Sequence, residues 1–396
     1  MYSSYLALRE KIPIDMPSVK PSIYSKEEHQ IQREAIDTEV LQLIFRLQRS
    51  GFITYLVGGS VRDLLLQLPP KDFDVVTEAK PGKIKQIFRS QCFLIGRRFR
   101  LAHVHLKGRV IEVSTFRKGD NDKCELILQD NTWGSPREDA LRRDFTINAL
   151  FYDPSKEIIV DFIGGWKDIE RKRLTLIGDP VARLTQDPVR MIRLLRFLAR
   201  FPFFIEENTK NALLSCRREI LKSCSPRVIE ELLRMLESPY ALSFLSLLFK
   251  WDFLSLLLPE LNAFIRSDHN HTTFCYLQSA RKYALQEKCT LERPVILSCL
   301  LFPILQSKIE KRETSSEQKI SMEKVEKEIL RIIQLVLCNK LLPFPQKICA
   351  SVEAILKMQY QIPLIKKRRH SSSSLQGILI RQAQQFFSIR TLIDLT

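Results

Sequence analysis

The sequence predicts an α/β head of about 180 residues followed by an all-helical remainder. Eleven of the twelve glycines lie before residue 180, where short elements need tight turns between them. The same stretch contains β-branched and aromatic runs, such as residues 53–57, that are typical of buried strands. Beyond residue 180 the chain becomes rich in leucine at helical spacing. We therefore expect a domain boundary near this position.

Composition changes along the chain divide it further. The first 25 residues include three prolines and are expected to be an extended or disordered lead-in. Residues 306–328 are dense in Lys, Glu and Ser and are expected to include an exposed linker. The four expected segments are the lead-in at 1–25, the head at 26–180, a helical neck at 181–260, and a helical body and tail at 261–396 with a basic C-terminal stretch.

Start and stop signals place the elements of the head. Ser50-Gly51 ends a first helix, and Pro81-Gly82 precedes a short amphipathic helix. Lys107-Gly108 joins two strand-like runs as a hairpin. The expected elements are helix 25–49, strand 53–57, a helix from Ser60, strand 72–76, helix 83–89, strands 101–106 and 109–116, a polar loop at 120–133, helix 135–143, and strands 158–162 and 174–177.

The charge of the chain is strongly positive. Lys plus Arg outnumber Asp plus Glu by 62 to 45, a net charge of +17. Such an excess implies a polyanionic partner, with nucleic acid as the first expectation and an anionic membrane surface or plain solubility as alternatives. No apolar run approaches a membrane span, so no membrane partner is expected. Nine cysteines without a Cys-x-x-Cys pair indicate a reducing, cytoplasmic location.

A glycine pair between the first strand and the next helix predicts a phosphate site. Gly58 and Gly59 let the backbone turn before a helix opens at Ser60. Free N–H groups at a helix start attract anions, and Arg62 on the first turn adds a forked cation. Taken alone, a Gly-Gly before a helix is more often an ordinary turn, so the phosphate site needs support from other residues.

An Asp-x-Asp pair lies about a dozen residues further along the chain. Asp72 and Asp74 lie two apart in a strand-like run, so both carboxylates project from one face while Phe73 points into the core. Adjacent carboxylates repel each other unless a divalent cation lies between them, and hard oxygens suit Mg²⁺. Together with the glycine turn, this pair favours a nucleotide and metal site over a solvated strand edge.

Arginines gather in two later segments. The first is Arg142-Arg143-Asp144, at a junction between a helix and the core, which on its own indicates a surface ion pair. The second is a helix after Pro188 that presents four arginines on one face. Without carboxylates nearby, such a stripe is costly unless an anion lies against it. The four residues are Arg190, Arg193, Arg196 and Arg200.

A basic turn enters a strand at residues 94–103 and carries Arg97, Arg98 and Arg100. His103 and His105 alternate on that strand, but we do not expect them to bind a metal, because the acids already provide for one. Near the other end of the chain, Lys366, Lys367, Arg368 and Arg369 precede four serines. Both basic segments are expected to hold RNA backbone, with a merely solvated tail as the alternative for the second.

Four motifs together resemble the class II nucleotidyltransferases, the family of bacterial poly(A) polymerases and CCA-adding tRNA nucleotidyltransferases. They are the glycine turn with its Asp-x-Asp pair, the basic turn at 94–103, the Arg142-Arg143-Asp144 segment and the arginine helix after Pro188. The resemblance covers residues 25 to about 260. Residues 94–103, and the lead-in at 23–29, resemble the poly(A) polymerase branch. The resemblance to the family implies a head of polymerase-β type with a mixed five-stranded sheet, followed by a helical neck, body and leg.

The resemblance also implies roles for particular residues. Asp72 and Asp74 would hold two Mg²⁺ ions, with Asp144 as the first candidate for a third carboxylate and Glu112, on a neighbouring strand, as the alternative. Two departures from the family pattern are Gln186 in place of Glu, which loosens base selection, and Ser60 in place of Gly, which a small side chain tolerates. The implied nucleotide contacts are Gly58, Gly59, Arg62 and Arg143 for triphosphate and ribose, Asp187 and Arg190 for the base, and Arg193 and Arg196 as further contacts.

The leading functional hypothesis is addition of AMP from ATP to RNA 3′ ends, of mRNA and also tRNA. CCA addition to tRNA is the nearest alternative, because it uses the same motifs. A catalytically idle RNA-binding protein and a small-molecule nucleotidyltransferase are alternatives of other classes. The intact acidic pair argues against the first of these, and the charge of +17 with a long helical tail argues against the second.

Overall fold

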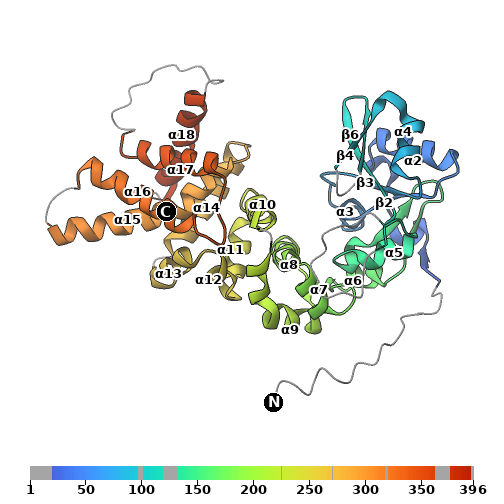
Figure 1. Ribbon diagram of the computed structural model, residues 1–396, viewed down its shortest axis with the longest axis horizontal. Coiled ribbons are helices and arrows are strands. Elements are labelled where there is room, and N and C mark those ends of the chain that lie inside the picture. The colour runs from blue at the N-terminus through green and yellow to red at the C-terminus, as the bar shows by residue number, and fades with distance from the viewer. Residues whose placement is uncertain are drawn as a thin grey trace, which may run out of the picture. The chain divides into compact units, whose positions relative to one another are not determined.

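Figure 1 shows the computed structural model, which describes residues 20–96, 101–118, 132–223, 225–269, 271–316, 320–361 and 375–393. The chain divides into two compact units between Gly178 and Asp179. The first unit contains a mixed sheet with its helices, and the second is almost entirely helical. In the described part of the chain, no helix combines the length and the apolar character needed to cross a membrane.

The sheet of the first unit has eight strands in the order β1-β8-β7-β2-β3-β6-β5-β4. β3 and β6 run parallel, and the other neighbours are antiparallel. The mixed sheet is confirmed, but the expected number of five strands is wrong. The strands are β1 (Ser22–Tyr24), β2 (Thr54–Val57), β3 (Asp74–Thr77), β4 (Cys92–Ile95), β5 (Leu101–Leu106), β6 (Arg109–Thr115), β7 (Leu150–Asp153) and β8 (Ile158–Asp161).

Three of these strands, β1, β4 and β7, were not predicted, and each has only three or four residues. β1 lies in the proline-containing lead-in and pairs with β8 at one edge, so part of residues 1–25 belongs to the sheet. β4 pairs with β5 at the other edge. The hairpin of β5 and β6 is confirmed, with Lys107 and Gly108 both at positive φ in its turn. The predicted loop at 120–133 lies largely outside the described residues, as do residues 1–19.

The helices of the first unit differ from prediction mainly at the start. The expected helix 25–49 is divided because Gln30 adopts a left-handed conformation that ends α1. A 3₁₀ turn at Arg33–Ala35 separates α1 from α2. The helices are α1 (Lys26–His29), α2 (Thr38–Arg49), α3 (Gly59–Leu65), α4 (Pro81–Phe88), α5 (Pro136–Arg142) and α6 (Gly165–Glu170), and the short strand β9 (Arg173–Leu174) comes after α6.

The stretch 306–328, which is expected to include an exposed linker, is largely helical in its described part. The buried carboxylate of Glu328 forms ion pairs with Lys308 at 3.3 Å and Arg312 at 2.8 Å and so joins two helices. The helices of the second unit are α7 (Pro180–Gln186), α8 (Val189–Arg200), α9 (Glu207–Cys216), α10 (Ser225–Leu236), α11 (Ala241–Lys250), α12 (Phe253–Leu257), α13 (Pro259–Ser267), α14 (Thr272–Gln286), α15 (Arg293–Ser316), α16 (Met322–Val336), α17 (Gln346–Met358) and α18 (Leu375–Ile393); β10 (Phe204–Ile205) comes after α8.

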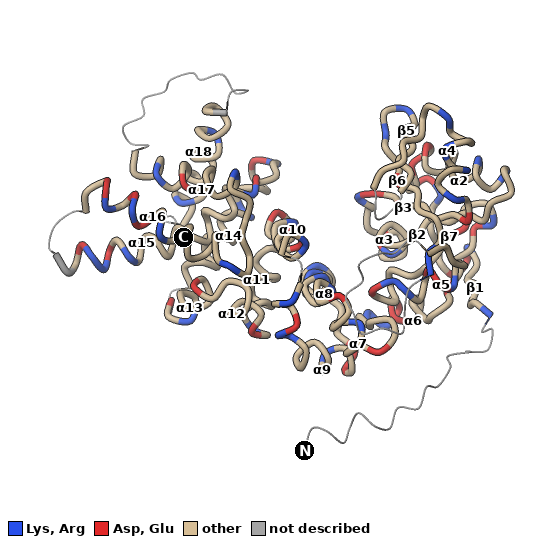
Figure 2. Tube along the Cα trace, viewed as in Figure 1, with Lys and Arg blue, Asp and Glu red and all other residues tan. Residues whose placement is uncertain are grey.

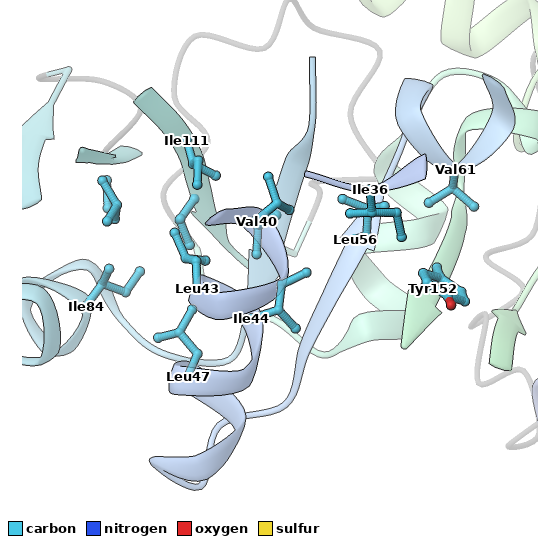
Figure 3. Packing of buried hydrophobic residues seen from close by; sticks show 14 of the residues in the cluster. Ile36, Val40, Leu43, Ile44, Leu47, Leu56, Val61, Ile84, Ile111 and Tyr152 are labelled. Carbon is cyan, nitrogen blue, oxygen red and sulfur yellow. The ribbon is translucent and has the colours of Figure 1, made fainter. Parts of the chain in front are cut away.

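Hydrophobic side chains pack on both faces of the sheet. One cluster joins α2 and α4 to one face, and Figure 3 shows Val40, Leu43 and Ile44 of α2 packed within it. A second cluster covers the opposite face around β2, β3 and β7, with Phe116 and Phe151 at its centre. This second cluster includes no residue of β4 or β5. The sheet is therefore covered on both faces at one end and mainly on one face at the other.

Close packing at Gly165, the first residue of α6, gives a test of the fold. A Cβ placed on Gly165 would lie 2.2 Å from the backbone oxygen of Thr146. We expect Gly165→Ala to lower the free energy of unfolding by about 3 kcal/mol, because the backbone must move to relieve this overlap. Gly82→Ala in α4 is the matched control, since its Cβ would meet nothing within 4 Å. Urea unfolding of the two variants measures the difference, and equal stabilities would contradict the packing described.

Candidate active site

Strand register brings carboxylates together on one face of the sheet. Asp74 of β3 is the aligned partner of Glu112 in β6 and of Val57 in β2. Aligned residues on neighbouring strands project from the same face. Asp72 lies two residues before Asp74 and shares its direction, while Phe73 packs against the core on the other side. The pair predicted from sequence is thus joined by Glu112, the alternative third carboxylate.

The turn after β2 meets these carboxylates at Gly58. This residue has φ of +79°, a conformation that side-chain-bearing residues rarely adopt. A Cβ placed on it would lie 3.6 Å from Asp74 Oδ2 and 3.6 Å from Arg143 Nη1. Glycine therefore leaves open the space between an acid and a cation. The Ser60 hydroxyl donates to the Val57 carbonyl oxygen at 3.1 Å, so this departure from the family pattern is accommodated inside the fold.

Arg143 is held in place by Asp139. Its Nε and Nη2 donate to Asp139 Oδ2 at 3.0 and 2.7 Å, and Arg142 Nε donates to Oδ1 at 3.0 Å. Burial raises the pKa of Asp139, but the charges and hydrogen bonds of Arg143 and Arg142 outweigh burial and lower that pKa below its usual value. The pairing leaves Arg143 Nη1 nearest the Gly58 turn. Arg142 and Arg143 therefore form more than a surface ion pair.

Arg62, which is predicted to contact the triphosphate, is buried next to the glycine turn. Its side chain is 4% exposed, and its Nε and Nη2 donate to Asp63 Oδ1 at 3.0 and 2.7 Å. Its Nη1 donates to Asn148 Oδ1 at 2.6 Å, and Asn148 in turn donates to Asp144 Oδ1 at 3.3 Å. A buried guanidinium needs such partners. We infer that Arg62 positions the turn beside Gly59, whose Cβ would lie 3.5 Å from Arg62 Nη2.

Asp144, the first candidate for the third carboxylate, belongs to this buried network. It is 6% exposed, and its Oδ1 also accepts from the backbone N–H of Phe145 at 2.8 Å. Glu112 by contrast is half exposed beside Asp74. The geometry therefore favours Glu112 over Asp144 as the partner of the acidic pair.

The pKa of the Asp74 carboxyl is raised by its surroundings. The carboxylate reaches solvent, yet desolvation by neighbouring protein atoms is the main cause that raises its pKa. Glu112 raises this pKa further, Arg143 lowers it, and Asp72 raises it. The acids on this face thus repel one another more than Arg143 compensates.

The donor set fits a divalent cation. Asp72, Asp74 and Glu112 supply the hard oxygen ligands that Mg²⁺ prefers, and their mutual repulsion is what a bound cation relieves. In the part of the chain that the structure describes, no three His, Cys, Asp or Glu side chains lie together as a finished metal cluster. The three carboxylates are therefore candidate ligands that do not form a closed cage among the described residues.

The predicted base-reading residues lie in the second unit. Both oxygens of Asp187, which ends α7, accept from the guanidinium of Arg227 in α10 at 2.9 Å. Arg190 is buried, and its Nη1 donates to the backbone oxygen of Arg183 at 2.8 Å. Gln186, the other departure from the family pattern, is 3% exposed. Asp187 thus has a fixed orientation, and Arg190 supports the end of α7.

The arginine stripe on α8 has a carboxylate partner, contrary to expectation. Figure 2 marks the cations of α8 and both signs of charge on α10. Glu231 of α10 lies 2.8 Å from Arg196 and 4.0 Å from Arg193. The stripe is therefore partly neutralised by the protein itself. The other predicted RNA contacts, Arg97, Arg98, Arg100 and the segment from Lys366 to Arg369, lie outside the described residues.

Sequence reasoning missed four residues that shape these sites. Asp139 precedes Arg143 by four positions on α5, and this helical spacing was a readable signal. Asn148 lies in a 3₁₀ turn, and no local pattern connects it with Arg62. Arg227 and Glu231 approach their partners from another helix, so only the packing of α10 against α8 reveals them.

Comparisons with known proteins match two separate stretches of the chain to family models. Residues 54–175 match the family model of the poly A polymerase head domain, and residues 202–265 match that of the probable RNA and SrmB-binding site of polymerase A. Poly(A) polymerase I of Haemophilus influenzae is 41% identical over 235 residues, 57% of this chain and 52% of the relative. The CCA-adding enzyme of Staphylococcus saprophyticus is 36% identical over 198 residues, 49% of this chain and 48% of the relative.

Solved structures show the same fold. The CCA-adding enzyme of Bacillus stearothermophilus in complex with CTP superposes with a TM-score of 0.56 at 23% identity, covering 89% of this chain and 77% of that one. The chain spans about half the length of the curated relatives that it matches.

The mixed sheet with acids beside a glycine turn, and the helical unit after it, give the chain the fold of the CCA-adding enzyme, and its residues 54–175 match the poly A polymerase head domain. The chain is more similar to the Haemophilus poly(A) polymerase I than to the Staphylococcus CCA-adding enzyme, at 41% against 36% identity.

The raised pKa of Asp74 gives a prediction for stability. A carboxyl with a raised folded-state pKa destabilises the fold increasingly as pH rises from its unfolded pKa to its folded pKa, and by a constant amount above. In EDTA at pH 7, Asp74→Asn should therefore unfold at a higher temperature than the wild type, with a gap that narrows toward pH 4. Glu78→Gln, an exposed carboxyl just after β3, is the control and should show no gap. A gap that widens on acidification would contradict the environment described for Asp74.

Proposed function

We propose that the protein is a template-independent polynucleotide adenylyltransferase, which transfers AMP from ATP to the 3′-hydroxyl of RNA, including mRNA, and releases pyrophosphate. The convergence of Asp74, Glu112 and Arg143 at the open Gly58 turn carries this proposal. An acid cluster for metal beside a cation and a glycine turn suits a triphosphate. The net charge of +17 suits a polyanionic acceptor.

Asp72, Asp74 and Glu112 would hold the Mg²⁺ ions. When bound, two such ions lower the pKa of the attacking hydroxyl and neutralise charge on the reacting phosphate and its leaving group. Glycine at position 58 leaves room for the triphosphate to approach the sheet edge. Arg143, oriented by Asp139, presents Nη1 to that space and binds a phosphate oxygen there. Arg62, bonded to Asp63 and Asn148, keeps the turn at Gly58 and Gly59 in position.

In the second unit, Asp187 and Arg190 are the proposed readers of the base. The two hydrogen bonds from Arg227 fix the Asp187 carboxylate, and each oxygen keeps acceptor capacity for a nucleobase amino group. A fixed acceptor discriminates bases better than a mobile one, because less side-chain entropy is lost on binding. Arg193 and Arg196 are proposed as further nucleotide contacts, with their charge moderated by Glu231.

CCA addition to tRNA is the second candidate, since CCA-adding enzymes are among the relatives and share the fold. The higher identity to the poly(A) polymerase favours AMP addition. The Asp-x-Asp pair is common to both activities, so the pair itself does not separate them.

A primer assay separates the two candidates. With Mg²⁺ and a single-stranded RNA ending in adenosine, we expect long tails from ATP alone and little incorporation from CTP alone. Asp74→Asn should abolish tailing, while Glu78→Gln, four residues further along the chain, should leave it intact. Addition of two C residues and one A to tRNA lacking CCA, followed by termination, would replace the adenylyltransferase proposal. No incorporation from any nucleotide would support an idle RNA-binding protein.

The third carboxylate is tested by a pair of variants. Glu112→Gln should reduce AMP incorporation about 100-fold or more, through loss of stabilisation at the reacting phosphate. It should also lose the rise in melting temperature that Mg²⁺ gives the wild type, without loss of stability in EDTA. Asp144→Ala should instead lower stability by about 1–3 kcal/mol, because the buried donors of Asn148 and Phe145 lose an acceptor, and should retain the Mg²⁺ response. The opposite pattern would make Asp144 the third carboxylate.

A further inference from the structure

The row of aligned residues that contains the acids continues to the edge of the sheet. Glu112 of β6 is the partner of His103 in β5, and His103 is the partner of Phe93 in β4. With Asp74, the row therefore crosses β3, β6, β5 and β4 on one face. His103 Nε2 lies 3.8 Å from Glu112 Oε2, so the row is continuous in its side chains as well.

This end of the sheet is mostly buried on one face, where Leu94 at the edge is an exception, and exposed on the other. Ala102, Val104 and Val113 are fully buried on the face that α4 covers. On the opposite face, the outward side chains are apolar or aromatic and yet exposed. Phe93 is 51% exposed, Ile95 47% and Val110 54%, and His103 and His105 lie between them. We call these five residues the open strand face.

Two contacts arrange the ring of Phe93. It meets His105 edge to face at 5.0 Å between ring centroids, and Lys85 Nζ lies 5.3 Å from its centroid. Lys85 is itself held by the backbone oxygen of Cys92. An aromatic ring is therefore presented to solvent with an imidazole and an ammonium group beside it.

Exposed rings of this kind are unusual without a ligand. Large apolar side chains gathered on one surface mark a binding site more often than chance exposure. Aromatic and imidazole rings with an adjacent cation are the groups on which unpaired bases stack, because every base has a π-face and a phosphate accompanies it. Continuity with the acids of the candidate active site indicates which nucleic acid arrives there.

We propose that the open strand face stacks the nucleotides next to the 3′ end of the RNA that receives AMP. This inference rests on the proposed function, because it names the acceptor's place at the same site. Strands lie about 4.8 Å apart, so Phe93 is about 14 Å from Asp74 along the row. Stacked nucleotides rise about 3.4 Å each, so about four terminal nucleotides cover that distance. The bases meet rings there, whatever their identity, which suits addition without a template.

Phe93→Ala tests the proposal, and Leu94→Ala is its matched control. Leu94 is 46% exposed on the same strand but projects from the opposite face. With a short oligoadenylate primer, we expect Phe93→Ala to raise the KM for RNA about tenfold, as loss of base stacking does, while the KM for ATP stays unchanged. Phe93→Tyr should restore the KM, because it restores the ring. Phe93→Leu should not.

A binding measurement separates this inference from the proposed function. A primer with 2-aminopurine three positions from its 3′ end should lose fluorescence on binding wild type, Leu94→Ala or Phe93→Tyr, and much less on binding Phe93→Ala. Asp74→Asn should retain the quenching while it abolishes tailing. Normal tailing with identical RNA KM and quenching in Phe93→Ala and Leu94→Ala would overturn the stacking inference alone. Quenching by wild type without AMP addition would overturn the proposed function, but it would still support base stacking on the open strand face.

Discussion

The site depends on the register of β3 between β2 and β6. Because Asp74 is aligned with Val57 on one side and Glu112 on the other, the turn at Gly58 and a second acid arrive at the same carboxylate. A shift of one residue would turn Asp74 toward the hydrophobic core and Val75 toward solvent. The buried side chains Val75, Val113 and Leu56 oppose that shift. Packing of the hydrophobic core therefore fixes the position of the Asp74 carboxylate, which lies outside that core.

Around this register, buried ion pairs orient groups rather than add stability. The Arg62 network with Asp63 and Asn148 removes a guanidinium and a carboxylate from water, and such burial costs about as much as the pairing returns. What the network supplies is one defined position for the turn at Gly59. Asp139 does the same for Arg143. The cation nearest the candidate phosphate position is therefore held by a residue that would contact no substrate.

Local patterns in the sequence predicted the acids and the glycine turn, because both are encoded within a few residues. The two-residue spacing of Asp72 and Asp74 defines a common face, and the hairpin at Lys107-Gly108 is encoded by its turn residues. The interactions that were not predicted join residues that are far apart in the sequence. Burial of Arg62 depends on Asn148, 86 residues away, and the partners of the α8 arginines come from α10. Within residues 306–328, Lys308 and Arg312 pair with Glu328 across two helices, and no local pattern predicts this pairing.

The two ends of the sheet differ in how far one of its faces is covered. Around β2 and β7 the second hydrophobic cluster closes the face that continues into the acids, and this supports the strands that carry them. On β4, β5 and the start of β6, the same face keeps Phe93 and Val110 exposed. In the reaction that we propose, the RNA acceptor would lengthen by one nucleotide at every cycle and would slide past the acids. Stacking on rings permits sliding because it does not depend on base identity. Hydrogen bonds to particular bases would have to break at each step. An apolar, aromatic surface beside a charged site would therefore suit the repeated addition that we propose.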